Sequence, residues 1–266
     1  MIVSTLLINV GDNPDRPRPG RSWLRNVYRV HHRLCMAFPS DERKISDENF
    51  LKPYKPEDFG QNHIHVPRGK DAGFLFRIDP IPGGQTVIVV QSAIQPDWDY
   101  AFQNADYLLA APPQTRQFHP QYPTGKPLLF RLMANPTRKI DTKSGPDGNR
   151  RNGKRVPVQP ENLLRWLVQK GEQSGFSVVE KGLIIQTSYI HFNKPNTHQK
   201  ERVCDRSPSK MDYGVRLRAI RYDGVLGVTD SDRFHAAIAQ GIGSGKSFGF
   251  GLLSVAPMKA TKCCHL

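Results

Sequence analysis

Three residues that can move protons lie within one predicted helix near the N-terminus. Tyr28, His31 and His32 fall in Ser22–Phe38, where apolar residues recur at three- and four-residue spacing. Tyr28 and His31 are i and i+3, so they share a helix face, and His32 is i+4 from Tyr28. A histidine can act as a general base or acid near neutral pH, and a tyrosine hydroxyl can orient a nucleophile or protonate a leaving group. Because Tyr28 and His31 also lie on the apolar stripe, packing in the core is the alternative interpretation.

Positive charge is concentrated in a second segment, residues 138–155. The chain has 38 Lys and Arg against 24 Asp and Glu, a formal net charge of +14. Seven of these cations occur within 18 residues, around a glycine-containing turn: Arg138, Lys139, Lys143, Arg150, Arg151, Lys154 and Arg155. Phosphate contacts dominate nucleic-acid affinity, so this basic arm favours an RNA partner. The alternative for any one of these residues is a solvated side chain that serves only solubility.

The glycine-rich segment Gly241–Gly251 (GIGSGKSFGFG) contains one lysine, Lys246. It does not fit the phosphate loop of nucleotide-hydrolysing proteins, because Gln240 stands where the first glycine is required. A predicted helix precedes it and an apolar strand follows it, which is the reverse of the phosphate-loop order. Closely spaced glycines still let backbone amides approach a ligand. We expect a tight helix-to-strand turn that packs on a neighbour, either alone or together with a contact to an RNA backbone.

Residue types that bind metals are present without a complete ligand set at zinc-site spacing. The candidate groups are His63 with His65, His191 with His198 and Cys204, and Cys263 with Cys264 and His265. None supplies four suitably spaced ligands, so we expect no metal site. The chain has four cysteines, two of them adjacent, which is a poor disulfide framework and predicts reduced thiols.

Length and composition indicate a folded, loop-rich protein of one large or two small domains. The 266 residues are 38% hydrophobic, with 22 Gly and 22 Pro, which excludes collagen, coiled-coil and low-complexity chains. No apolar run approaches the roughly 18 residues of a membrane span, and Met1–Asn9 lacks the flanks of a signal peptide. We therefore expect a cytoplasmic protein with no membrane partner.

The first half of the chain predicts the elements that would position the Tyr28–His31 helix. Strands are expected at Ile2–Asn9, Gly73–Asp79, Thr86–Ser92 and Pro112–Phe118, and helices at Ser22–Phe38 and Asp97–Leu109. The resulting order, β-α-β-β-α-β, is that of a ferredoxin-like unit.

The second half predicts the same order again. Strands are expected at Leu128–Ala134, Phe176–Ile190, Val215–Tyr222, Val225–Val228 and Phe248–Ala256, with a hairpin turn at Asp223-Gly224, and helices at Gln159–Gln173 and Asp230–Gln240. The expected fold class is α+β, with tandem ferredoxin-like (RRM-like) domains at 1–122 and 123–266. The first domain carries the Tyr28–His31 helix, and the second carries the basic hairpin and the C-terminal glycine-rich loop.

Three stretches, in order along the chain, resemble the CasE proteins, the CRISPR RNA-processing endoribonucleases of type I-E Cascade systems. Gly241–Pro257 resembles their glycine-rich loop and closing strand. Phe130–Pro136 (FRLMANP) is similar to their F-R-L-x-A-N-P strand and is followed by a basic segment that ends in KRVPV at Lys154–Val158. Tyr28–Pro39 (YRVHHRLCMAFP) resembles the Y-x-x-H of the first helix, seven residues before F-P. The resemblance covers nearly the whole chain.

The resemblance implies that His31 and Tyr28 are catalytic. His32 could replace His31 geometrically, but only His31 fits both Y-x-x-H and the distance to F-P. Arg33 stands where some relatives have a basic residue and could stabilise the charge of the transition state, or it could be a solvated arginine. The expected RNA-binding residues are Arg33, Arg131, Arg138, Lys139, Arg150, Arg151, Lys154, Arg155 and Lys246.

The resemblance also implies a metal-independent endoribonuclease that cuts precursor CRISPR RNA within the repeat, at the 3′ base of the stem-loop. Attack of a 2′-OH on the adjacent phosphate would leave a 2′,3′-cyclic phosphate and a 5′-OH. The enzyme would then keep the mature crRNA and join other Cascade subunits. The competing hypothesis is a non-catalytic subunit of the same fold that binds the RNA stem-loop, in which His31 is structural. A third is a ribosomal or tRNA-binding protein of convergent composition.

Overall fold

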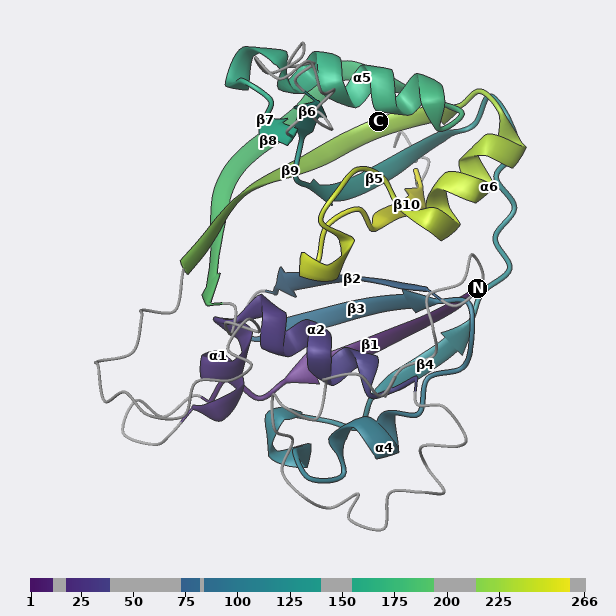
Figure 1. Ribbon diagram of the computed structural model, residues 1–266. Helices are drawn as coiled ribbons and strands as arrows, with labels where there is room; N and C mark the ends of the chain where they lie inside the picture. The colour runs from purple at the N-terminus through teal and green to yellow at the C-terminus, as the bar shows by residue number, and fades with distance from the viewer. Residues whose placement is uncertain (12–17, 39–72, 82–83, 140–154, 194–213, 259–266) are drawn as a thin grey trace, which may run out of the picture. The chain divides into compact units, whose positions relative to one another are not determined.

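The computed structural model describes residues 1–11, 18–38, 73–81, 84–139, 155–193 and 214–258 (Figure 1). The chain forms two compact units. The first comprises Met1–Phe118 with Tyr189–Leu217, and the second comprises His119–Ser188 with Arg218–Leu266. The domain limits at residues 122 and 123 stay a prediction.

The first unit has a four-stranded antiparallel sheet in the order β2-β3-β1-β4. Its elements are β1 (Ile2–Ile8), α1 (Pro19–Leu24), α2 (Val27–Cys35), β2 (Phe74–Pro80), β3 (Thr86–Ser92), α4 (Trp98–Phe102), the 3-10 turn η2 (Asp106–Leu108) and β4 (Gln114–Gln117). This is the ferredoxin-like strand order, in which the first and third strands are central. Figure 1 shows α2 lying across the face of this sheet.

The prediction of one helix over Ser22–Phe38 is wrong, because α1 and α2 are separate helices. Asn26 leaves the helical conformation (φ −116°, ψ 90°) and its side-chain oxygen accepts a hydrogen bond from the backbone N–H of Tyr28. It is therefore the N-cap of α2, a position at which Asn is strongly preferred. The predicted helix Asp97–Leu109 is likewise shorter, because α4 ends at Phe102 and only a 3-10 turn follows.

The second unit has a four-stranded sheet in the order β10-β5-β9-β8 and a small ribbon of β6 and β7. Its elements are β5 (Pro127–Ala134), β6 (Thr137–Lys139), β7 (Arg155–Pro157), the 3-10 turn η3 (Pro160–Asn162), α5 (Leu163–Gln173), β8 (Phe176–Asn193), β9 (Gly214–Val228), α6 (Ser231–Gln240), the 3-10 turn η4 (Lys246–Phe248) and β10 (Leu253–Pro257). The end of β8 and the beginning of β9, within Tyr189–Leu217, belong to the first unit. The four strands again follow the ferredoxin-like order. The predicted α+β class with tandem ferredoxin-like units is confirmed.

The predicted hairpin at Asp223-Gly224 is wrong, because β9 runs straight through these residues. The Asp223 carboxylate accepts hydrogen bonds from Arg131 on the neighbouring β5, at 2.6 Å, and from Arg221. Gly224 lies so close to its neighbours that an added Cβ would be 3.0 Å from Leu183 Cδ1 and 3.3 Å from Phe130 Cε1. The glycine thus permits close packing of strands and does not form a turn.

The predicted final strand Phe248–Ala256 begins later than expected, at Leu253. Gly249 and Gly251 precede it with φ of 81° and 91°, in a conformation that strands of L-residues do not adopt. The glycine-rich loop therefore extends to Leu252. None of the helices in the described ranges has the length and hydrophobicity of a membrane span.

Each unit has a buried core formed by its sheet and the helices packed on it. In the first unit, Leu6, Phe76 and Val90 of the sheet are fully buried, as are Val30 and Leu34 of α2. In the second unit, buried Tyr222 stacks on Trp166 of α5 and donates its hydroxyl to the carbonyl of Leu163 at 3.2 Å. Burial raises the pKa of Tyr222, so this hydroxyl remains a donor. Helix α5 is thereby fixed on β9.

Gly175, between α5 and β8, provides a test of the second unit's packing. Its φ is +74°, and an added Cβ would lie 2.4 Å from the carbonyl oxygen of Asp230, the N-cap of α6. Gly125 has φ +83° and open space around it. We expect Gly175→Ala to lower the free energy of unfolding by more than about 2 kcal/mol, and Gly125→Ala by about 1 kcal/mol from backbone strain alone. Urea unfolding measures both, and equal losses would contradict the close packing at Gly175.

Candidate active site and nucleic-acid interface

Helix α2 presents its apolar face to the sheet and its polar residues at the edge of that contact. Val27, Val30, Leu34 and Cys35 are buried, and the Asn26 cap fixes where the helix begins. Phe38, just after the helix, stacks on Phe74 of β2 with ring centroids 5.1 Å apart. This packing therefore sets the position of α2 relative to β2.

The His31 ring, on α2, packs against the aromatic residues of β2. Its ring stacks on Phe74, with centroids 5.5 Å apart, and lies 6.1 Å from the ring of Phe76 at an interplanar angle of 15°. One turn along the helix, Cys35 Sγ is 3.5 Å from His31 Nε2 and 3.9 Å from Nδ1. The imidazole is half-buried, so it is held in place by its surroundings yet retains exposed surface. Sequence reasoning missed these neighbours of His31, although the i+4 spacing of Cys35 indicates one of them.

Tyr28 packs against His32. The two ring centroids are 4.0 Å apart at 53°, whereas His31 and His32 are 6.0 Å apart. Burial, and then the nearby Cys35, raise the pKa of the Tyr28 hydroxyl above its ordinary value of about 10. Tyr28 therefore stays protonated at neutral pH and can donate a hydrogen bond or a proton. The structure brings Tyr28, His31 and His32 together on α2, with Tyr28 in ring contact with His32.

Arg33 has a structural partner. Its Nη1 donates to the carbonyl oxygen of Ala101 in α4, at 3.0 Å. This hydrogen bond is strengthened by the charge of the donor, and a cation near the C-terminal end of a helix also interacts favourably with the helix dipole. Arg33 thus ties α2 to α4, a role that neither interpretation of the sequence included.

The basic arm begins and ends in the ribbon of β6 and β7. Lys139 pairs with Arg155, and Arg138 pairs with Val156. Arg138, Lys139 and Arg155 are all exposed, so three of the predicted RNA-binding cations lie together at one end of the ribbon. Lys143, Arg150, Arg151 and Lys154 lie outside the described residues.

The base of this ribbon is joined to the glycine-rich loop. Ser244 Oγ donates to the carbonyl of Asn135 and lies 3.2 Å from Thr137 Oγ1. Arg155 Nη1 in turn donates to Thr137 Oγ1 at 3.4 Å. No local sequence pattern predicts this contact, because Ser244 and Thr137 are more than a hundred residues apart.

The glycine-rich loop packs tightly on its neighbours, as the sequence predicted. Gly251 N–H donates to the carbonyl of Met133 at 2.8 Å, and an added Cβ at Gly245 would meet Phe250 Cδ2 at 2.9 Å. Lys246 opens the 3-10 turn η4, and partial burial lowers its pKa. A partly desolvated ammonium group interacts more strongly with an anion than a solvated one does.

Arg131 is held by an ion pair. Its Nε lies 2.6 Å from Asp223 Oδ1, and its side chain is 38% exposed. The remaining guanidinium surface can still approach a phosphate, although the Asp223 carboxylate offsets part of the charge.

Metal ligands do not converge in the described part of the chain, where no group of three or more His, Cys, Asp or Glu side chains could hold a metal ion. Of the histidines and cysteines weighed as metal ligands, only His191 is described. The others, His63, His65, His198, Cys204, Cys263, Cys264 and His265, lie outside the described residues.

A comparison with known families matches residues 4–257 to the family described as CRISPR associated protein. The chain belongs to this family. The match covers both compact units, the α2 site and the glycine-rich loop. The resemblance inferred from three short motifs therefore extends over the fold that carries them.

Individual relatives within the family agree with the resemblance to CasE. The CRISPR-associated endoribonuclease Cse3 of Thermus thermophilus is 30% identical over 190 residues, which cover 69% of this chain and 79% of that protein. The CRISPR system Cascade subunit CasE of Escherichia coli is 26% identical over 240 residues, 90% of this chain and 96% of that protein. A structure of CRISPR endoribonuclease Cse3 bound to 19 nt RNA has a TM-score of 0.65 at 26% identity, covering 97% of this chain and 100% of that one. The predicted membership in the CasE group is confirmed.

Removal of the Asn26 cap tests how α2 is positioned. Asn26→Ala leaves the N–H of Tyr28 without its side-chain acceptor, and we expect a loss of about 1 kcal/mol in the free energy of unfolding. Asn26→Asp keeps the acceptor and should retain most of that stability. Thermal or urea unfolding provides the measurement, and an Asn26→Ala protein as stable as the parent would contradict the cap.

Proposed function

We propose that the protein is an endoribonuclease that cleaves precursor CRISPR RNA within the repeat, at the 3′ base of the stem-loop, and then retains the mature crRNA as a subunit of Cascade. The observation that carries this proposal is the place of His31. It is half-buried on the capped helix α2, with Tyr28 on the same helix, in a chain 30% identical to a CRISPR-associated endoribonuclease. The E. coli relative is named as a Cascade subunit, which supports the same assembly for this chain.

The proposed reaction is an intramolecular transfer within the RNA. The 2′-oxygen attacks the adjacent phosphorus, the bond to the 5′-oxygen breaks, and a 2′,3′-cyclic phosphate and a 5′-OH result. One group must accept the 2′-OH proton and another must protonate the departing 5′-oxygen. The side chains of this site supply both functions, so the reaction requires neither a metal nor another cofactor.

The proton roles follow from the surroundings of the two residues. A tyrosine hydroxyl is protonated at neutral pH, and the raised pKa of Tyr28 keeps it so. We assign Tyr28 as the donor to the leaving oxygen or to a phosphoryl oxygen. His31 can then serve as the base, since an imidazole accepts a proton near neutral pH. The stack on Phe74 and the contact with Cys35 limit the rotation of the His31 ring. A held ring loses less conformational freedom when the substrate binds.

RNA binding is assigned to the exposed cations of the ribbon and to Lys246 of the glycine-rich loop. A-form RNA has a deep, narrow major groove, so contacts to phosphates and 2′-hydroxyls should predominate. The Ser244 contacts hold the loop and the base of the ribbon as one surface. Arg150, Arg151 and Lys154 lie outside the described residues, and their roles in RNA binding stay predictions. Arg131 is assigned a weaker contribution because of its ion pair.

The second candidate is a subunit that binds the RNA stem-loop and does not cleave it. It is favoured by one observation: the ring contact of Tyr28 is with His32, while His31 contacts Phe74 and Cys35. In that case His31 serves only to pack α2 on β2. The two candidates differ in whether the wild-type protein cuts its cognate repeat.

Substitution of the histidines separates these candidates. In excess EDTA, we expect His31→Ala to slow cleavage of the cognate repeat RNA by about 10²- to 10⁴-fold, the usual contribution of a general base, with RNA affinity retained. His32→Ala is the control and should keep most activity. A gel assay under single-turnover conditions measures both. Equal rates for wild type and His31→Ala would remove His31 from the reaction, and a wild type that binds but never cuts would favour the second candidate.

The ribbon cations should carry the salt dependence of binding. Each phosphate contact that is lost lowers the slope of log affinity against log salt by about one. We therefore expect Arg138→Gln and Lys139→Gln each to weaken binding and to reduce this slope, as measured by filter binding over a range of salt. Lys181→Gln removes an exposed cation of β8 and should leave the slope unchanged. If Arg138→Gln and Lys139→Gln leave the salt slope unchanged, as Lys181→Gln should, the ribbon is not the phosphate-binding surface.

A further inference from the structure

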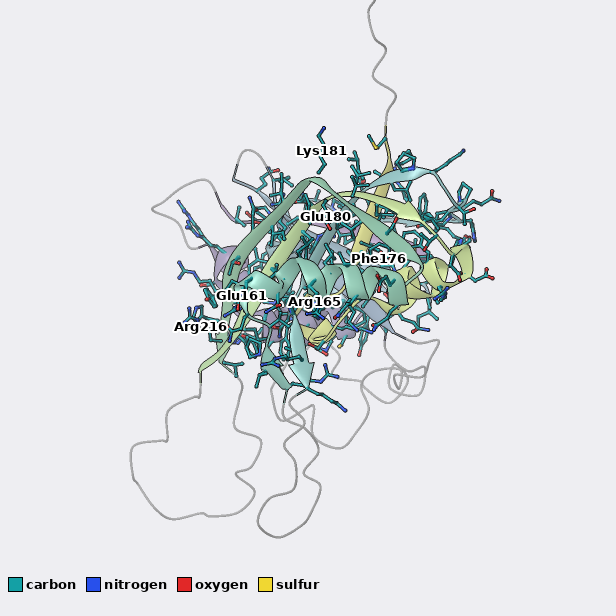
Figure 2. All side chains as sticks on the ribbon, turned by 90° about the horizontal axis from the view of Figure 1, so that it is seen from above. Glu161, Arg165, Phe176, Glu180, Lys181 and Arg216 are labelled. Carbon is teal, nitrogen blue, oxygen red and sulfur yellow. The ribbon has the colours of Figure 1, made fainter. Side chains whose placement is uncertain are left out.

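An exposed aromatic side chain and an arginine are stacked near the end of β8 and the beginning of β9. The Arg216 guanidinium carbon lies 3.8 Å from the centre of the Tyr189 ring (Figure 2 labels Arg216). Tyr189 is 45% exposed, and Arg216 is also exposed. His191 is exposed as well, and strand alternation places it on the same face of β8 as Tyr189.

The pair has no evident role in the core. Tyr222 is a structural tyrosine for comparison: it is fully buried, and its hydroxyl donates to a backbone carbonyl. Tyr189, by contrast, leaves nearly half of its surface in water. An exposed cation–π pair contributes little to folding stability. Its geometry therefore requires another explanation.

A planar guanidinium over an exposed aromatic ring forms a surface on which a nucleobase can stack. Proteins that bind single-stranded nucleic acid combine aromatic rings with cations, because every base has a π face and every nucleotide has a phosphate. Arg216 adds a positive charge, and its guanidinium plane can itself stack on a base. The contact between Tyr189 and Arg216, at the described ends of β8 and β9, combines an aromatic ring with a cation.

We propose that Tyr189 and Arg216 form a stacking site for an unpaired base of the RNA, in a nucleotide that precedes or follows the stem-loop in the RNA sequence. This site deepens the proposed function and rests on it, because it selects RNA that has unpaired nucleotides beside the stem. His191, on the same face, is placed to contact the phosphate of the stacked nucleotide.

The test compares two uncleavable RNAs, each with a 2′-deoxy nucleotide at the cut site. One is the repeat stem-loop alone, and the other carries several unpaired nucleotides at its 5′ or 3′ end. We expect Tyr189→Ala to weaken binding of an extended RNA by roughly tenfold, the usual effect of removing a stacking ring, and to leave binding of the stem-loop unchanged. Tyr189→Phe keeps the ring and should bind like the parent.

Two further variants serve as controls. One distinguishes stacking from charge, and the other shows whether the loss of an unrelated surface tyrosine has the same effect. Arg216→Lys keeps the charge but not the plane, and should weaken the extended RNA nearly as much as Arg216→Ala. Tyr107→Ala removes a tyrosine that is 56% exposed in η2 and should change neither affinity. A 2-aminopurine base in the unpaired segment should be quenched by the wild type and not by Tyr189→Ala.

The outcomes distinguish this site from the proposed function. If wild type binds the stem-loop but gains nothing from either extension, or if Tyr189→Ala matches Tyr107→Ala on every RNA, the stacking site is refuted and the proposed function stands. If Tyr189→Ala weakens the stem-loop and the extended RNA equally, the residue contacts the stem and the proposal is also refuted. If wild type does not bind the stem-loop at all, both proposals fail.

Discussion

The packing of α2 against β2 is the constraint on which the candidate active site depends. Phe38 and His31 both stack on Phe74, and fully buried Val30 and Leu34 hold the helix on the sheet. These contacts hold the His31 ring in an aromatic cluster, yet part of its surface stays exposed. Two hydrogen bonds add to this packing: the Asn26 side chain caps the start of α2, and Arg33 ties the helix to α4. A local change at any of these residues is expected to act on the chemistry through the position of one imidazole.

The second unit uses the same fold for a different purpose. Its sheet is held by α5 through Trp166 and Tyr222, and the Arg131–Asp223 pair joins β5 to β9. The glycine-rich loop then fills the space between α6 and β10, where any side chain larger than hydrogen at Gly245 would collide with Phe250. Through Ser244 this rigid loop fixes the base of the ribbon that carries exposed cations. In the proposed function, the first unit supplies the proton-transfer groups and the second supplies the cations that bind RNA.

The sequence predicts the two ferredoxin-like units, most of the strands and the residues of the α2 site, because alternation and helical spacing are local signals. It fails where a distant contact overrides a local preference. Asp223-Gly224 is a strong turn signal, yet two arginines satisfy the aspartate and Leu183 and Phe130 close around the glycine, so the strand continues. Asn26 divides a periodic helix because its backbone leaves the helical conformation and its side chain caps the N–H of Tyr28. The partners of Arg33 and Ser244 could not be predicted, since each is determined by packing that spacing alone does not specify.

In the proposed reaction, side chains of α2, and not a metal ion, move the protons of RNA cleavage. The decisive measurement is of the chemical ends that cleavage of the cognate repeat leaves in excess EDTA. We expect cleavage at full rate, an upstream fragment that ends in a 2′,3′-cyclic phosphate, a downstream fragment with a 5′-OH, and no cleavage when the 2′-OH at the cut site is replaced by hydrogen. Fragments with a 5′-phosphate, or activity abolished by EDTA and restored by a divalent cation, would contradict it.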